Sequence, residues 1–233
     1  MPIHMLKKLF TYVPLFISLL LFTSCFEILE EISFNKDGSG RITVTANLSK
    51  SKSKLASVML LDSVNGYKVP SKKDIDLAMK NAVDHLKKTQ GISNIEKTAD
   101  YDNYIFSIAC DFTSVESVNS IFKEMINNQN RREKTSFSTT NFSYNDENHQ
   151  FKRHFKYDGS IKKKFNSLKS EDKKVFNDAS YTTIYRFNSS VKSVSNSGAK
   201  IAPNKKAVFM RVSALPLITG QQTLENTIQL INN

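Results

Sequence analysis

The first part of the chain after residue 25 shows two segments in which apolar and polar residues alternate. Residues 26–34 place apolar side chains at even positions, with Glu30 as the exception, and residues 41–48 alternate without an error. This period of two is typical of half-buried strands. Between them lie Asn35-Lys-Asp-Gly-Ser-Gly40, turn-forming residues in which Gly38 or Gly40 can take a positive φ. The pattern predicts an N-terminal β-hairpin.

Apolar residues then take helical spacing in four segments. The second of these is the best marked, because Ser71 and Asp74 can form a capping arrangement and Lys87, Lys88 and Gly91 are typical of a helix end. The four predicted helices cover residues 49–64, 71–88, 114–127 and 167–177.

Further strands and loops complete the pattern. Polar residues indicate loops at 129–134 and 158–164, and the tail at 223–231 fits a helix or a strand equally well. Strands are predicted at 92–97, 104–112, 136–144, 149–157, 181–187, 191–195 and 207–212. No linker rich in Pro, Gly or Ser divides them. We therefore expect residues 25–233 to form one α+β domain, an antiparallel sheet with helices packed on one face.

The first 24 residues have a different character. Lys7 and Lys8 precede an apolar stretch at 9–22, which is too short to span a bilayer comfortably, and small residues follow it. A basic start, a short apolar middle and small residues at the end are typical of a secretory signal.

The end of this segment, Leu21-Phe-Thr-Ser-Cys25, resembles the lipobox of bacterial lipoproteins. The resemblance implies cleavage between Ser24 and Cys25 and acylation of Cys25, which would hold the protein on a membrane. Phe26 is not the Asp that favours inner-membrane retention, so an outer-membrane location is expected, and the glutamates at 27, 30 and 31 resemble the acidic tract of some Bacteroidetes lipoproteins. The alternative is an uncleaved anchor followed by an ordinary buried thiol.

A second resemblance concerns both ends of the region after Cys25. Residues 35–40, 48–50, 185–196 and 205–209 are similar to the LppM-like lipoproteins, although Asn188 stands where that family often has Pro. The resemblance implies an α+β domain on a lipid anchor, with a role in binding envelope lipids or glycolipids and no known catalysis.

Charge adds one set of candidate contacts. The 233 residues include 33 Lys and Arg against 22 Asp and Glu, a formal net charge of +11. The basic residues are scattered, which is typical of a solvated surface. If they bind an anionic lipid or glycolipid, the best candidates are Arg131, Arg132, Lys162, Lys163 and Lys164. Secretion argues against nucleic acid as a partner.

The sequence contains no pattern typical of catalysis or of a cofactor. Its two cysteines exclude a disulfide-rich scaffold, and Cys110 lies in an apolar segment typical of a buried free thiol. His85, His149 and His154 lack metal-ligand spacing, and Ser39 lacks the nucleophile elbow of a hydrolase. We therefore expect no metal or cofactor and a non-catalytic binding or structural module for a lipid, a glycolipid or an envelope protein. The alternatives are an envelope hydrolase whose residues converge only in three dimensions and an envelope assembly component.

Overall fold

The structure is a computed structural model that describes residues 26–64, 66–129 and 140–232. The predicted signal, its cleavage site and Cys25 lie outside these residues, as do Arg131 and Arg132. The core of the described fold is formed by residues after 26, so the segment 26–233 contains all of it.

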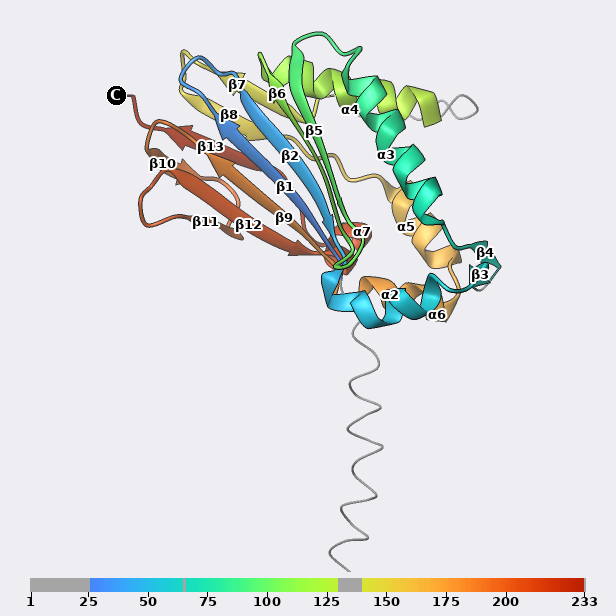
Figure 1. Cartoon of the computed structure of the whole chain (residues 1–233). Helices are drawn as coiled ribbons and strands as arrows, with labels where there is room; N and C mark the ends of the chain where they lie inside the picture. The colour runs from blue at the N-terminus through green and yellow to red at the C-terminus, as the bar shows by residue number, and fades with distance from the viewer. Residues whose placement is uncertain (1–25, 65, 130–139, 233) are drawn as a thin grey trace, which may run out of the picture.

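The larger of the two main sheets has seven strands in the order β11-β12-β9-β1-β2-β6-β5 (Figure 1). The predicted hairpin is confirmed as β1 and β2, which pair in register from Glu27 with Asn47 to Phe34 with Gly40. The pair β1 and β9 is parallel and the other pairs of this sheet are antiparallel. The strands are β1 (Glu27–Phe34), β2 (Gly40–Asn47), β5 (Ile92–Asp100), β6 (Ile105–Phe112), β9 (Ser180–Arg186), β11 (Ala199–Ile201) and β12 (Ala207–Ser213).

A second sheet of four antiparallel strands packs on part of the larger one. Its order is β10-β13-β8-β7, and the ambiguous tail of the chain supplies the strand β13. The tail is a strand because Asn226, Ile228 and Leu230 alternate into the interior. The strands are β7 (Phe142–Asn145), β8 (Gln150–Arg153), β10 (Val191–Val194) and β13 (Asn226–Leu230).

An aromatic cluster holds the two sheets together. Phe34 stacks on Phe187 with ring centroids 5.3 Å apart, and Phe151 from β8 lies 4.9 Å from both Phe34 and Tyr185. These side chains are buried. Large buried aromatic side chains contribute strongly to a core, so this half of the inner face is tightly covered.

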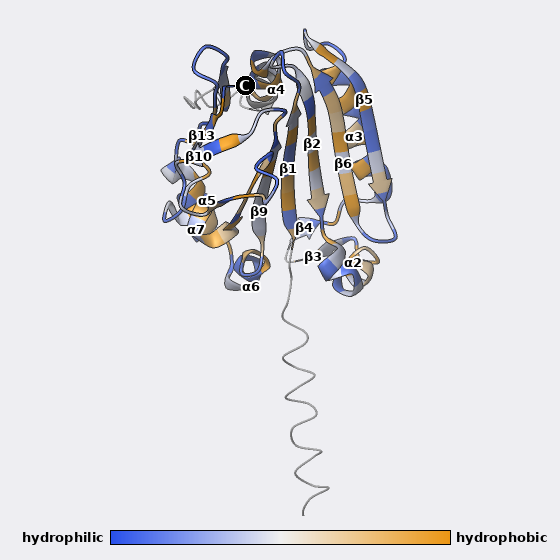
Figure 2. Ribbon diagram, turned by 90° about the vertical axis from the view of Figure 1, so that its left-hand side faces the viewer, coloured by the Kyte–Doolittle hydropathy of each residue, from blue (hydrophilic) through white to orange (hydrophobic). Residues whose placement is uncertain are grey.

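Helices α3 (Lys72–Leu86) and α4 (Val115–Gln129) cover the other half of the same inner face, as predicted (Figure 1). The predicted cap is confirmed: the Ser71 side chain accepts a hydrogen bond from the Asp74 amide and the Asp74 carboxylate accepts one from the Ser71 amide. Asn119 ties α4 to the second sheet, since its side chain donates to the Phe142 carbonyl at 2.8 Å. Hydrophobic and hydrophilic residues alternate along the strands in Figure 2.

Two predictions about local structure are wrong. The helix expected at 49–64 ends early: η1 (Ser49–Ser51) and α2 (Lys52–Val58) are followed by a small hairpin, β3 (Ser63–Val64) and β4 (Tyr67–Lys68), with Gly66 at φ +87°. The loop expected at 158–164 is the helix α5 (Gly159–Ser167), because Asp158 caps it by accepting from the Ser160 amide and Ile161 and Phe165 lie one turn apart.

The remaining helical elements are short. The helix expected at 167–177 is divided into α6 (Ser170–Lys173) and η2 (Lys174–Phe176), and α7 (Ala214–Thr219) was not predicted. Within the described parts of the chain, no helix has the length and apolar character needed to cross a membrane.

Candidate functional site

An apolar cavity of about 290 Å³ lies between the inner face of the larger sheet and the two covering helices. Its floor is formed by β2 and β6, where alternate residues point to the same side. Three cross-strand pairs line it, namely Ile42 with Cys110, Val44 with Ile108, and Ala46 with Phe106. The same alternation that predicted these strands therefore produces a continuous apolar floor.

The helices form the opposite wall. Their contributions come from one face each, at the three- and four-residue spacing of an amphipathic helix. Helix α3 supplies Met79, Ala82 and Leu86, and α4 supplies Val118, Ile121 and Phe122. Apart from Ser107 of β6, every residue lining the cavity is apolar.

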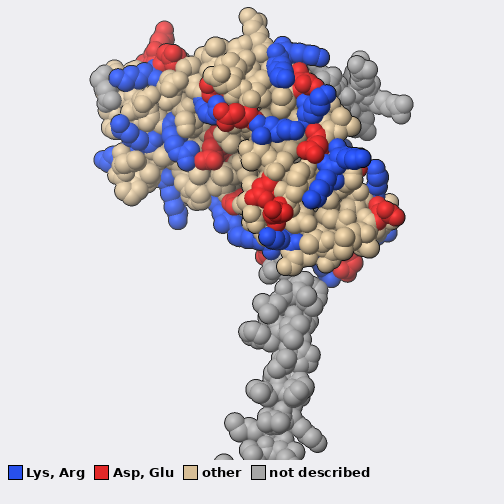
Figure 3. Space-filling model, viewed as in Figure 1, with Lys and Arg blue, Asp and Glu red and all other residues tan. Residues whose placement is uncertain are grey.

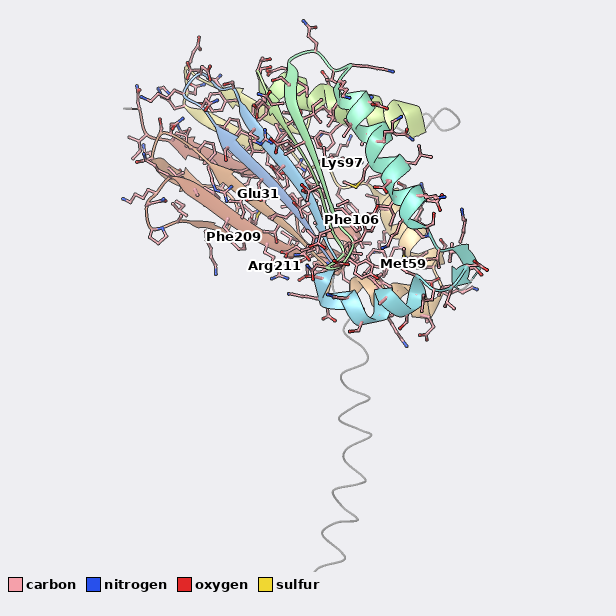
Figure 4. The ribbon with its side chains drawn as sticks, viewed as in Figure 1. Glu31, Met59, Lys97, Phe106, Phe209 and Arg211 are labelled. Atoms are coloured by element: carbon pink, nitrogen blue, oxygen red, sulfur yellow. The ribbon has the colours of Figure 1, made fainter. Side chains whose placement is uncertain are left out.

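The cavity is closed at one end and open at the other. The pair Ile42 and Cys110 is buried, with 5% and 2% of the residues exposed. One pair further along, Val44 is 37% exposed although it points to the inner face of the sheet, and Ala46 and Phe106 are half-buried. The opening is therefore at the end where β2 leads into α2. Figure 4 shows Phe106 and Met59 toward this end of the molecule.

Cys110 forms part of the closed end. It is a free, buried thiol, as predicted. Burial raises its pKa to about 11, and this effect outweighs that of the nearby Arg41 guanidinium. A thiol of this kind is a poor nucleophile at neutral pH, so Cys110 contributes apolar surface.

A buried polar network stands beside the cavity, under the second sheet. Glu30 of β1 is fully buried, and its carboxylate accepts from Arg153 Nε at 3.3 Å and Nη2 at 3.2 Å. The hydroxyls of Tyr181 and Tyr185 donate to the same carboxylate. The Arg153 guanidinium also lies 4.7 Å from the centre of the Phe142 ring.

Charge and burial act together in this network. Burial lowers the pKa of Arg153, but the Glu30 carboxylate, Tyr185 and Tyr181 together more than offset this and raise it. Burial, and then the Glu30 charge, raise the pKa of both Tyr181 and Tyr185, so the two hydroxyls remain donors. Arg153 and the two tyrosine hydroxyls donate to the Glu30 carboxylate, and Arg153 Nη1 also donates to the His154 carbonyl at 2.8 Å. A buried carboxylate and guanidinium that are paired and hydrogen-bonded in this way form a structural ion pair.

A second, more polar hollow of about 180 Å³ lies at the turns near the far end of β1. It is lined in part by Lys36, Tyr144, Asp146 and His149. In the described segments, no group of three or more His, Cys, Asp or Glu side chains could hold a metal ion. This hollow lacks the deep apolar walls of the cavity.

The basic residues predicted from the sequence do not form one site. Lys162, Lys163 and Lys164 are exposed on α5. Consecutive helical residues point in directions about 100° apart, so the three side chains spread around the helix. On the face seen in Figure 3, basic and acidic side chains are interspersed.

Sequence reasoning missed the cavity, although the strands and helices that line it were predicted. One signal was available in the sequence. Apolar faces are present on two predicted strands and on two predicted helices, at 41–48, 104–112, 71–88 and 114–127, which is more apolar surface than one face of a single sheet would bury. Glu30 was noted as an exception to the alternation, and no partner was assigned to it.

Comparisons with known proteins return little. No protein-family model matches the chain, and no curated protein is significantly similar to it in sequence. The folded domain of LppM from Mycobacterium tuberculosis, solved by NMR, is similar over 88% of this chain and 88% of that one, with 11% identity and a TM-score of 0.42. LppM gives its name to the family that the sequence resembles, but at this level the likeness carries no inference about function.

Proposed function

We propose that this protein is a lipid-anchored lipoprotein of the cell envelope whose domain binds an apolar chain of a lipid or glycolipid in the cavity. The observation that carries the proposal is the half-open apolar floor, where Val44 points inward and is still 37% exposed. Contact between water and such an apolar surface is unfavourable. Each methylene of a ligand that is buried against this surface contributes about 0.8 kcal/mol to binding.

The size and chemistry of the cavity support this ligand. Pockets for small molecules have volumes of about 300–1,000 Å³, and an engineered apolar cavity of about 150 Å³ already binds benzene. At about 290 Å³, the cavity suits an acyl chain, with the headgroup left at the opening. Ser107 is the one polar residue among the described residues that line it, and no His, Asp or Glu lies beside Ser107 in that lining to activate it, which favours binding over hydrolysis.

The anchor is the second part of the proposal. It is supported by the lipobox resemblance at Cys25 and by the start of β1 directly after it, at Glu27. The proposed location is the outer membrane, because residue 26 is Phe and not the Asp that favours retention in the inner membrane. Replacing Cys25 with Ala is expected to abolish acyl labelling and to leave unprocessed precursor, measured by metabolic labelling and the mass of the protein. Processing to the same mature mass would contradict the anchor.

The first test of the cavity is the native mass of residues 26–233 expressed in an envelope-competent host. We expect a bound mass that is lost on organic extraction. The extracted domain is then titrated with saturated fatty acids of increasing chain length. A ligand at about 100 times its Kd stabilises a protein by about 2.7 kcal/mol, so the Tm should rise by about 5–10 °C.

A matched pair of variants locates the binding. Ala82→Phe fills the cavity from α3, while Ala78→Phe adds the same side chain at an exposed position one turn earlier on the same helix. We expect the first variant to lose fatty-acid binding and the second to keep it. Equal binding by both would show that the ligand lies elsewhere.

A further inference from the structure

We propose that the tip of the segment between β2 and α3 docks on the surface of a bilayer containing anionic lipid. The tip is defined as residues 59–64 and 66–69, which follow α2 and include the hairpin β3–β4. This interaction goes beyond ligand binding in the cavity, and it relies on the proposed anchor only for the orientation of the domain.

The tip exposes apolar side chains to an unusual degree. Leu60 is 87% exposed, Tyr67 58% and Leu61 53%. With Leu77 at 56%, these are the four most exposed large hydrophobic residues in the described part of the chain. Scattered exposed hydrophobic residues are common, but a group concentrated in one short segment indicates an interaction surface.

The tip also projects from the body of the domain. The strands β3 and β4 pair with each other and with no strand of either main sheet. The base of the segment is held firmly, since the Leu48 amide donates to the Tyr104 carbonyl at 3.0 Å and Lys52 Nζ donates to Asn103 Oδ1 at 3.2 Å. Leu60 and Leu61 therefore have no core of their own and are presented at the end of a supported arm.

The charges around the tip fit an anionic surface. Residues 49–73 contain six lysines and a single acidic residue, Asp62. Lys54 precedes the tip on α2, and Lys72 and Lys73 follow it in the first turn of α3, all of them exposed. Apolar side chains rimmed by lysines are the combination that binds the interface of an anionic bilayer.

The position of the tip favours a bilayer over a protein partner. Glu27, the first residue of β1, pairs with Asn47, which leads directly into η1 and α2. The tip, the open end of the cavity and the residue next to Cys25 thus lie toward one end of the domain (Figure 1). An acyl anchor on Cys25 would hold this end at the membrane, with the opening of the cavity toward the lipid.

The test is flotation of residues 26–233, which lack the anchor, with vesicles of phosphatidylcholine alone or mixed with phosphatidylglycerol. We expect binding to the mixed vesicles that weakens as salt is added. The variant Leu60→Ser, Leu61→Ser, Tyr67→Ser should bind at least about tenfold more weakly, because a single leucine leaving water is worth about that factor. The control Ile201→Ser, Phe209→Ser, Ile231→Ser changes two aliphatic residues and one aromatic residue, also exposed, and should bind like the wild type.

Two further variants test the charge. Lys54→Gln, Lys72→Gln, Lys73→Gln should weaken binding by up to about fivefold per lysine, and more than Lys162→Gln, Lys163→Gln, Lys164→Gln, which removes the same charge from α5. Equal losses would contradict a surface centred on the tip. Because the sequence has no Trp, Leu61→Trp provides a single fluorophore whose emission should shift to the blue on binding.

Several results would overturn the proposal. The first is equal vesicle binding by the wild type and the tip variant, and the second is no binding of the wild type to the mixed vesicles. The third is a dimer in solution that the tip variant disrupts, with no binding to vesicles. Failure of this proposal is distinguishable from failure of the proposed function. Vesicle binding by a domain that takes up no fatty acid would refute only the ligand, and fatty-acid binding without vesicle binding would refute only the docking surface.

Discussion

Replacing Glu30 with Gln should destabilise the domain strongly, even though the change preserves size and shape. Glu30 is fully buried and faces Arg153, which is itself only 7% exposed. The amide removes the charge that balances the guanidinium. It also places an NH2 group among the Arg153 and Tyr185 donors that the carboxylate accepts. Breaking a buried ion pair from one side costs about 3–5 kcal/mol.

The next residue of the same strand provides the control. Glu31 also pairs with an arginine, Arg186, at 2.9 Å, but the Arg186 side chain is 48% exposed. Exposed ion pairs contribute about 0.2–1 kcal/mol, so Glu31→Gln should cost little. The two variants make the same chemical change one residue apart, and they differ in burial (Glu31 is labelled in Figure 4).

The assay is urea unfolding of residues 26–233 followed by circular dichroism. With a slope of about 2 kcal/mol per M, Glu30→Gln should lower the midpoint by about 2 M and Glu31→Gln by less than about 0.5 M. A double-mutant cycle with Arg153→Met measures the coupling, and we expect the double variant to recover part of the loss. If Glu30→Gln cost no more than Glu31→Gln, the network would not hold the two sheets together.

Three further predictions follow from the same structure. Gly40→Ala should destabilise by about 1–3 kcal/mol, since a Cβ there would overlap the Ser33 carbonyl oxygen. Gly159→Ala should cost nothing, because a Cβ there would meet no atom outside its chain neighbours and its own helix; urea midpoints compare the two variants. Because burial raises the pKa of Cys110 from 9.0 to about 11, its contribution to stability is complete below pH 9 and is lost between pH 9 and 11. From pH about 8 to about 10.5 the wild type should therefore lose about 2 kcal/mol more than Cys110→Ala, and parallel pH profiles would contradict this. In the fatty-acid titration, each pair of added methylenes should tighten Kd about 15-fold until the cavity is full and then cease to do so; an affinity independent of chain length would refute an acyl chain in the cavity.

Local patterns were sufficient to predict most strands and the two covering helices. The hairpin of β1 and β2 has a turn between two alternating segments, and α3 begins at a capping box and ends near Gly91. Such signals act between residues close in the chain. A loop was predicted in place of α5 because of the charged run Lys162–Lys164. Ile161 and Phe165, one turn apart on the same helix, were not used in that prediction.

The partners of distant residues could not be predicted in this way. Glu30 and Arg153 are 123 positions apart, and nothing near either residue identifies the other. The parallel pairing of β1 with β9 is equally remote. The cavity is a still harder case, because the pattern shows which side chains point inward but does not give the distance between two apolar faces.

The division of the inner face explains how one sheet can be both firmly packed and open. On β1 and β9, the aromatic cluster and the Glu30 network bind the second sheet and fix that half of the face. On β2 and β6, the residues that line the cavity point to the same side and face α3 and α4. Because the first half supplies the packing that the fold needs, the second half can leave Val44 uncovered without loss of the sheet. An apolar ligand would therefore bind to a preformed floor and would need to order little of the protein, which lowers the cost of binding.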